Sequence, residues 1–236
     1  MIGGTEAQKA EWLPRLAAGE IASFGLTEPG SGSDSAAMQT IAVKSGNGWK
    51  LNGTKRYITN SPFANIALIM ARTSKEALPK NAHVSAFLVP MDTPGITVRP
   101  IHSIADDHDF NQVFFEDVRV PVSGRLGEED QGWGVAKYLL EFERAVAHSA
   151  GLKAALAEVV RHARSLTDDS GGLLLDTPGI RRRISILDAQ IAAIEASEDV
   201  VMAQVARGRN PGPAASMLKI QGTETAQQVQ QLVLQI

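Results

Sequence analysis

Residues 41–59 read IAVKSGNGWKLNGTKRYIT, and this stretch indicates β structure. It contains two turn signals, Gly46-Asn47-Gly48 and Asn52-Gly53. An Asn-Gly dipeptide is a strong hairpin signal because both central positions of the tight turn need positive φ angles. The stretch therefore predicts β-strands that are joined by two short turns.

Further strand-like runs follow, and they continue to about Pro121. They read ANIALIMAR, HVSAFLVP, GITVRPI and NQVFFEDVRVP. Prolines and glycines separate these runs, and no helical pattern lies between them. At least six strands in about 100 residues favour an antiparallel β-barrel or sandwich over an alternating α/β nucleotide fold.

After Gly132 the apolar residues recur with a helical period. Three long helices are predicted, and their apolar stripes are Val135, Leu139, Phe142, Val146 and Leu152 in the first, Ile184, Leu187, Ile191, Ile194, Val201 and Val205 in the second, and Leu218, Thr225, Val229, Leu232 and Ile236 in the third. Short connections between long helices favour an up-down bundle.

The predicted fold class is a multidomain α+β protein. Residues 1–20 are expected to be the remnant of an N-terminal helical domain that is largely missing. A middle β-barrel domain is predicted over residues 21–125, and a truncated C-terminal helical domain over residues 126–236. The last helix stops on Ile236 without a cap, so the chain is expected to be part of a longer polypeptide.

Composition excludes several classes of function. The chain has 236 residues and a formal net charge of −3, which disfavours a nucleic-acid partner. It contains no cysteine, which excludes disulfides, thiolate metal sites and cysteine nucleophiles. No apolar run approaches the roughly 20 residues of a membrane span, and no signal peptide is visible. These features predict a cytoplasmic protein without a membrane partner.

The stretch GLTEPGSGSD, residues 25–34, combines glycines with hydroxyl side chains. Glycines allow a ligand to approach the backbone closely, and the hydroxyls and turn N–H groups can donate hydrogen bonds. This combination suits a diphosphate or the edge of a heterocycle. A loop in which Ser and Asp cap neighbouring turns has the same composition. Composition alone leaves both interpretations open.

Four segments resemble signatures of the acyl-CoA dehydrogenase family. Residues Thr27 to Asp34 match T-E-P-x-x-G-S-D, residues 52–61 read NGTKRYITNS, and residues 114–121 read FFEDVRVP. The fourth signature, a G-x-G-W stretch, is only partly present in EEDQGWGVAKYLLEFERA. Residues 92–101, DTPGITVRPI, and residues 209–228, RNPGPAASMLKIQGTETAQQ, look most like the branch that contains pimeloyl-CoA dehydrogenase large subunits and related bacterial acyl-CoA dehydrogenases.

The resemblance implies an FAD cofactor and names the residues that would hold it. Phe24, Leu26 and Thr27 would lie against the isoalloxazine ring, and Tyr57, Ile58 and Thr59 against the other part of the ring. Gly32 and Ser33 would lie near the diphosphate and the pantetheine. Ser33 is also a predicted substrate contact. Many family members carry tryptophan at the position of Tyr57.

The resemblance leaves the catalytic base open between two positions. In most members this glutamate lies in a late helical stretch, which here would be beyond Ile236. In a minority it directly precedes an arginine, and this chain has Glu143 and Arg144 in the sequence EFERA. We therefore expect Glu143 as the base and Arg144 as a substrate-side charge. A solvated Glu-Arg pair on a helix face has the same pattern.

The implied reaction is α,β-dehydrogenation of an acyl-CoA thioester, with electrons passed to an electron-transfer flavoprotein. The resemblance implies a homo- or hetero-oligomer. An R-x-x-F-G element that contacts the FAD of a neighbouring subunit in many members is absent here, so the family's usual tetramer is not carried over and a complex of two unlike chains is an option. The alternatives are a flavin-dependent oxidase or monooxygenase, and a non-catalytic partner subunit in a heteromer. The five histidines and the acidic stretch 106–109 lack metal-site spacing.

Overall fold

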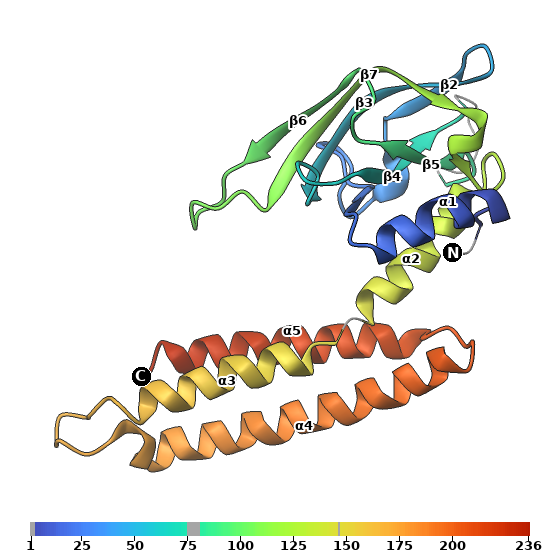
Figure 1. The fold of residues 1–236 in the computed structure, drawn as a ribbon. Coiled ribbons are helices and arrows are strands. Elements are labelled where there is room, and N and C mark those ends of the chain that lie inside the picture. Colours follow the sequence, from blue (N-terminus) through green and yellow to red (C-terminus); the bar gives the residue numbers. More distant parts are fainter. Residues whose placement is uncertain (1–2, 75–80, 146) are drawn as a thin grey trace. The chain divides into compact units, whose positions relative to one another are not determined.

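A computed structural model describes residues 3–74, 81–145 and 147–236 of the chain. The chain divides into two compact units, Met1–Lys137 and Tyr138–Ile236 (Figure 1). The division falls inside helix α2 (Gly132–Arg144). The domain boundaries at residues 20/21 and 125/126 remain predictions. Among the described helices, none is long and apolar enough to cross a membrane.

The first unit is built mainly from a β-sheet. Its elements are α1 (Glu6–Ala17), β1 (Ala22–Gly25), η1 (Ser35–Ala37), β2 (Ile41–Lys44), β3 (Gly48–Thr59), β4 (Ile66–Arg72), β5 (Val84–Pro90), β6 (Ile96–Ile101), β7 (Phe110–Pro121), η2 (Val122–Gly124), β8 (Arg125–Leu126) and the first part of α2. Helix α1 begins with a capping box, in which Thr5 and Gln8 exchange side-chain hydrogen bonds. The Gln8 amide also donates to the carbonyls of Ser123 and Arg125, at 2.6 and 2.9 Å, and so fastens α1 to the sheet.

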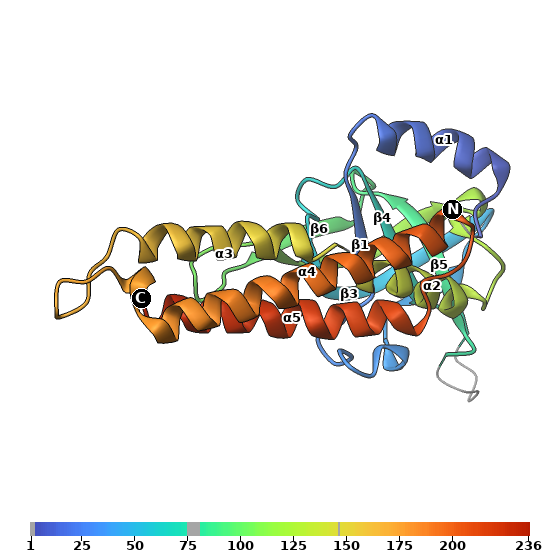
Figure 2. The same ribbon diagram turned by 90° about the horizontal axis from the view of Figure 1, so that it is seen from below.

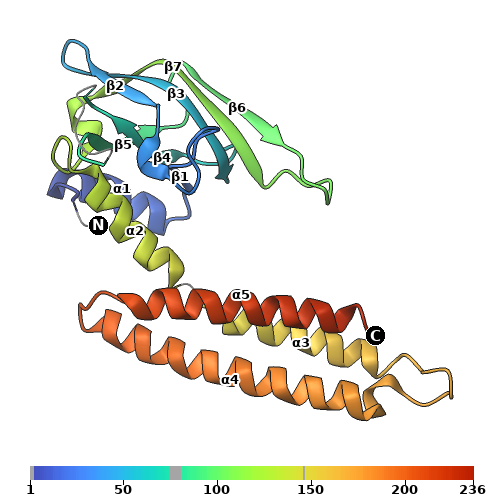
Figure 3. The same ribbon diagram turned by 180° about the vertical axis from the view of Figure 1, so that it is seen from behind.

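The eight strands form one sheet in the order β6-β7-β3-β2-β4-β5-β8, with β1 paired to β4 (Figure 3). Most neighbouring strands are antiparallel, which confirms the predicted pattern. The pairings of β1 and of β2 with β4 are parallel, and neither was predicted. Parallel neighbours need a long connection, and the β2–β3 hairpin supplies it between β1 and β4.

The first predicted turn is confirmed and the second is wrong. Gly46 has a φ of +58° in the β2–β3 hairpin. Asn52 and Gly53 instead lie inside the continuous strand β3. A Cβ on Gly53 would lie 2.6 Å from the Thr40 Cα atom, so this glycine allows a close backbone approach rather than a reversal of the chain.

The core of the first unit lies on one face of the sheet. Trp49 and Phe87 meet edge to face there, with ring centroids 5.5 Å apart. Around them are buried apolar side chains from five strands, Ala42, Leu51, Ile58, Ala67, Ile69, Ala71, Val89, Val113, Phe115, Val118 and Val120. The packed core thus includes side chains of β3 and β4, whose ends continue into loops.

The second unit contains three long helices side by side (Figure 1, Figure 2). They are α3 (Ser149–Ala163), α4 (Pro178–Ala206) and α5 (Pro213–Val233), with η3 (Leu174–Asp176) between the first two. The second and third predicted stripes supply most of the core, which includes Leu152, Leu156, Val159, Leu187, Ile191, Ile194, Val201, Leu218, Val229 and Leu232. Of the first predicted stripe only Leu152 belongs to it, and Val135, Leu139 and Phe142 are half-buried in α2. The predicted helical bundle is therefore confirmed.

The first predicted helix is in fact two helices, because α2 ends at Arg144 and α3 begins at Ser149. Val146 lies outside the described residues. The buried Glu198 carboxylate of α4 accepts hydrogen bonds from the His148 N–H (2.5 Å), the Ser149 N–H (3.1 Å) and the Ser149 hydroxyl (2.5 Å). It satisfies donors that a new helix start leaves unpaired. Burial opposes ionisation of Glu198, but these hydrogen bonds outweigh it and lower its pKa.

Candidate functional site

The two segments predicted to contact a flavin meet where β1 and β3 end. The Arg56 N–H donates to the Thr27 carbonyl at 2.8 Å. The Ser23 hydroxyl donates to the Thr59 carbonyl at 3.1 Å. Sequence segments about thirty residues apart are therefore joined by direct hydrogen bonds. This is the central feature of the candidate site, and all of it lies within the first unit.

Tyr57 lies in a β-bulge with an unusual backbone conformation. The pairing of β3 with β7 shifts between Lys55 and Ile58, so two residues of β3 face one of β7. Tyr57 has a φ of +59°, and for an aromatic residue this conformation costs about 1–3 kcal/mol. The bulge leaves the Tyr57 side chain 52% exposed, while that of Ile58 is 3% exposed.

The Tyr57 ring is held by two neighbours. The Arg56 guanidinium carbon lies 4.9 Å from the centre of the ring. The ring of Phe110 approaches it edge to face, with centroids 6.4 Å apart. These contacts orient an exposed aromatic surface next to Thr59. An oriented, exposed ring of this kind is suited to stacking against a flat ligand.

The remaining predicted contacts differ in exposure. Phe24 and Thr27 are half-buried, Leu26 is buried and Thr59 is exposed. Gly32 and Ser33 are both exposed, in the loop that follows the Glu28–Ser31 bridge.

The donors at the site fit a cofactor with many acceptor atoms. Neither the Thr27 nor the Thr59 hydroxyl forms a hydrogen bond to any described residue, so both are available to a ligand. The Ser31 hydroxyl is buried and likewise has no partner among the described residues. A Cβ at Gly32 would meet no atom within 4 Å, so the chain itself does not require glycine there. A flavin ring and a diphosphate supply acceptors for these hydroxyls and a reason for the open space.

A buried ion pair lies directly beneath these segments. The Lys55 ammonium donates to the Glu28 carboxylate at 2.7 Å, and the two side chains are 0% and 4% exposed. Burial of Lys55 lowers its pKa to about 8, although the Glu28 charge opposes this effect. Burial of Glu28 opposes its ionisation, but the Lys55 charge and the hydrogen bond from Gln39 outweigh it and lower its pKa.

Sequence reasoning gave neither Glu28 nor Lys55 a role. A usable signal is present, because Trp49 and Leu51 mark the buried face of β3 and period-2 alternation places Lys55 on the same face. A lysine at such a position needs a buried partner.

Glu143 and Arg144, the predicted base and substrate-side charge, lie in the last turn of α2, in the second unit. Both side chains are exposed, and neither forms a hydrogen bond or ion pair with any described residue. Their roles remain predictions.

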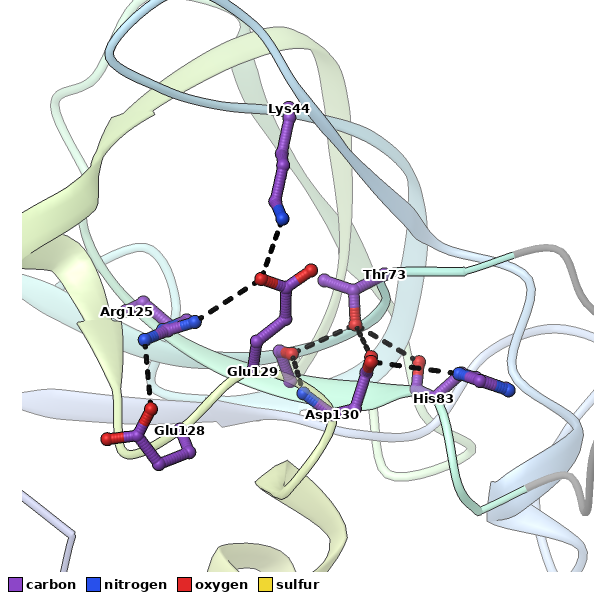
Figure 4. Close-up of polar contacts among 8 residues, drawn as sticks. Lys44, Thr73, His83, Arg125, Glu128, Glu129 and Asp130 are labelled. Carbon is purple, nitrogen blue, oxygen red and sulfur yellow. Dashed lines mark hydrogen bonds and ion pairs between the residues drawn. The ribbon is translucent and has the colours of Figure 1, made fainter.

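Another polar cluster connects β5 with the loop before α2 (Figure 4). The Asp130 carboxylate accepts from the Thr73 hydroxyl at 2.5 Å and lies 3.8 Å from a ring nitrogen of the buried His83. Glu129 turns the other way, toward Lys44 and Arg125, at 2.8 and 3.6 Å. The cluster fastens the start of α2 to the sheet and includes none of the predicted flavin contacts.

The most prominent groove of the first unit does not coincide with the predicted flavin contacts. A groove of about 960 Å³ is bordered by α1 and by residues such as Trp12, Phe63 and Met91, and none of the predicted flavin contacts lines it. Within the described ranges, no group of three or more His, Asp or Glu side chains could hold a metal ion.

Two family models match the chain. The model for the acyl-CoA dehydrogenase middle domain matches residues 23–118. The model for the acyl-CoA dehydrogenase C-terminal domain matches residues 130–236. Between them they cover most of the chain, and the first contains the whole candidate site.

The similar proteins agree with both models. Acyl-CoA dehydrogenase FadE26 of Mycobacterium tuberculosis is 31% identical over 100% of this chain and 60% of its own length. Butyryl-CoA dehydrogenase from Megasphaera elsdenii is 29% identical, with a TM-score of 0.89 over 98% of this chain and 61% of the other. A chain of the ChsE4–ChsE5 complex from Mycobacterium tuberculosis is 31% identical, with a TM-score of 0.84 over 98% and 60%. This chain thus spans about 60% of the length of these proteins.

Proposed function

Because this chain belongs to the acyl-CoA dehydrogenase family, a family of FAD-dependent oxidoreductases, we propose that its full-length protein dehydrogenates an acyl-CoA thioester. The observation that most supports this proposal is the junction of the Thr27 and Thr59 segments by the Arg56 and Ser23 hydrogen bonds. The junction brings together two segments that carry hydroxyls without a partner among the described residues and an oriented aromatic ring, and these features support a flavin cradle.

FAD, when bound, supplies the hydride acceptor for the β-hydrogen of the substrate. The chain supplies placement and hydrogen bonding. The Thr27 and Thr59 hydroxyls would donate hydrogen bonds to the flavin ring, and Tyr57 would pack against it. Gly32 and Ser33 leave room for the diphosphate, and Ser33 offers a hydroxyl on the substrate side.

Glu143 is the proposed base that removes the proton from the carbon next to the thioester carbonyl. A carboxylate is a weak base in water, so this role requires that substrate or further protein exclude water from it. Arg144, the next residue, is proposed to pair with an anionic part of the CoA. A glutamate beyond Ile236 is the alternative base.

The partners are also proposals. Electrons are proposed to leave through an electron-transfer flavoprotein, and the cytoplasmic location stays a prediction. A heteromeric assembly is supported by two observations, the missing R-x-x-F-G element and the similarity to a chain of the ChsE4–ChsE5 complex. In that second candidate function, this chain would complete an active site only beside an unlike subunit.

The test is the visible spectrum of the purified full-length protein, before and after anaerobic addition of a panel of acyl-CoA thioesters. The proposal predicts a flavin spectrum that one class of thioester bleaches, and slow return of the colour in air. Fast return in air would identify an oxidase instead. A flavin that no thioester bleaches, unless the neighbouring gene product is added, would support the heteromer. A colourless protein that cannot be loaded with FAD in either form contradicts the proposal.

A further inference from the structure

We propose that Glu28 and Lys55 form a buried clamp that holds the two halves of the flavin cradle at a fixed separation, so that both are positioning residues for FAD. The inference rests on the proposed function. Glu28 belongs to the loop that follows β1, and Lys55 belongs to β3. The pair therefore connects the two segments that a flavin would have to contact together.

The contacts of Lys55 join both halves at the backbone. Its ammonium donates to the Glu28 carboxylate at 2.7 Å and to the Leu26 carbonyl at 3.1 Å. Leu26 directly precedes Thr27, whose hydroxyl has no partner in the part of the chain that the structure describes. The next residue of β3, Arg56, donates its N–H to the Thr27 carbonyl at 2.8 Å. Two consecutive residues of β3 thus fix two consecutive carbonyls of the loop.

Glu28 extends the clamp to a third segment. Its carboxylate accepts from the Gln39 N–H at 2.5 Å and from the Thr40 N–H at 3.0 Å, at the start of β2. Both carboxylate oxygens are therefore engaged. The loop that contains Gly32 and Ser33 lies between Glu28 and these residues, so the same carboxylate closes its base.

Lys55 also stands directly before the bulge. The register of β3 against β7 shifts immediately after Lys55, and the strained Tyr57 follows two residues later. A strained backbone conformation persists only where the surrounding structure fixes it from several sides. Lys55 supplies one such fixed point, because its side chain is 0% exposed and its ammonium has two bonded partners.

Stability alone does not account for a charged pair at this position. The free energy needed to remove two charges from water offsets much of their mutual attraction. Well-packed apolar side chains in their place often give equal or greater stability. What an apolar pair cannot provide is a fixed hydrogen-bond geometry at the Leu26 carbonyl and the Gln39 and Thr40 N–H groups. The clamp should therefore affect the bound flavin more than the folding of the apoprotein.

The test compares the full-length protein with three variants, Lys55→Met, Glu28→Gln and the double variant that carries both. Lys50→Met is the matched control, because Lys50 lies in the same strand and its partner Asp117 is exposed. Each apoprotein is titrated with FAD by flavin fluorescence. The visible circular dichroism of the bound flavin is recorded at saturation, and thermal unfolding of each apoprotein is measured.

The double variant is decisive because it leaves no unpaired buried charge. We expect its apoprotein to unfold near the wild-type temperature, its Kd for FAD to rise about tenfold, and its visible circular dichroism to change. Lys50→Met should keep the wild-type Kd and spectrum. If the single variants do not fold, the double variant still decides the question.

Three outcomes overturn the inference. A folded double variant with wild-type Kd and visible circular dichroism would show that the clamp does not position the flavin, and would leave the proposed function intact. A double variant that loses folding stability and FAD affinity in proportion would show a structural role only. A wild-type protein that binds no FAD, with or without its neighbouring gene product, would overturn the proposed function as well.

Discussion

Because Lys55 is buried, the free energy of unfolding of the first unit should increase as the pH rises above about 8. Burial holds its native pKa at about 8, below the ordinary value of 10.5 that applies to the unfolded chain. Between these values the unfolded chain keeps a proton that the native chain has released, so rising pH favours the native state. The change is about 1.4 kcal/mol per pH unit, or about 3 kcal/mol across the whole window. It is absent below pH 8 and complete above 10.5.

The assay is urea unfolding of the wild type and Lys55→Met at pH values from 7 to 10.5. Tryptophan fluorescence reports on this unit specifically, because Trp12, Trp49 and Trp133 all lie within it. The free energy of unfolding of the wild type minus that of Lys55→Met should rise with pH. Titration of other lysines cancels in this difference. A difference that stays level, or that falls as pH rises, would refute the assignment of a buried, destabilised charge to Lys55.

Three further variants probe other parts of the molecule. Tyr57→Asn places a residue that tolerates positive φ in the bulge, so apoprotein stability should hold or rise by about 0.5–1 kcal/mol. FAD affinity should fall, and an unchanged affinity in a fluorescence titration would exclude stacking by Tyr57. Glu143→Gln should lower turnover of the full-length enzyme by about 100-fold or more with FAD content unchanged, and full activity would assign the base elsewhere. Glu198→Ala should destabilise the helical unit by about 1–3 kcal/mol, measured by far-ultraviolet circular dichroism. Ser197→Ala should change stability less, because the half-buried Ser197 hydroxyl bonds only to the Ala193 carbonyl of its own helix.

Local patterns predicted most of the fold. The strand-like runs correspond to β4–β7, and the apolar stripes around Ile191 and Val229 became the helical core because each reflects one buried face. The Asn52-Gly53 dipeptide wrongly predicted a turn. Gly53 instead lies where only a residue without a Cβ can pack closely against Thr40, which is distant in sequence. The break between α2 and α3 was missed for a similar reason, since the cap comes from Glu198 on another helix.

The two segments were singled out through their motifs, and in the structure hydrogen bonds from Arg56 and Ser23 join them. Their contact with a flavin stays a prediction. The strained φ of Tyr57 could not be inferred, because the bulge depends on the register between β3 and β7. The Glu28–Lys55 pair could have been suspected, since alternation along β3 places a lysine on the buried face. Its partner could not be named without the fold, because Glu28 approaches from a different segment.

The central claim is that the loop around Gly32 and the bulge around Tyr57 form a surface for FAD, and Gly32→Leu tests it most directly. Gly32 is exposed and a Cβ added there would meet no atom of the chain within 4 Å, so the leucine should change folding little, but it would occupy the space assigned to the cofactor. The wild-type and variant apoproteins should unfold at the same temperature. Titration of each with FAD should show an affinity at least about tenfold weaker in the variant. Equal FAD affinities for the two proteins would contradict the account.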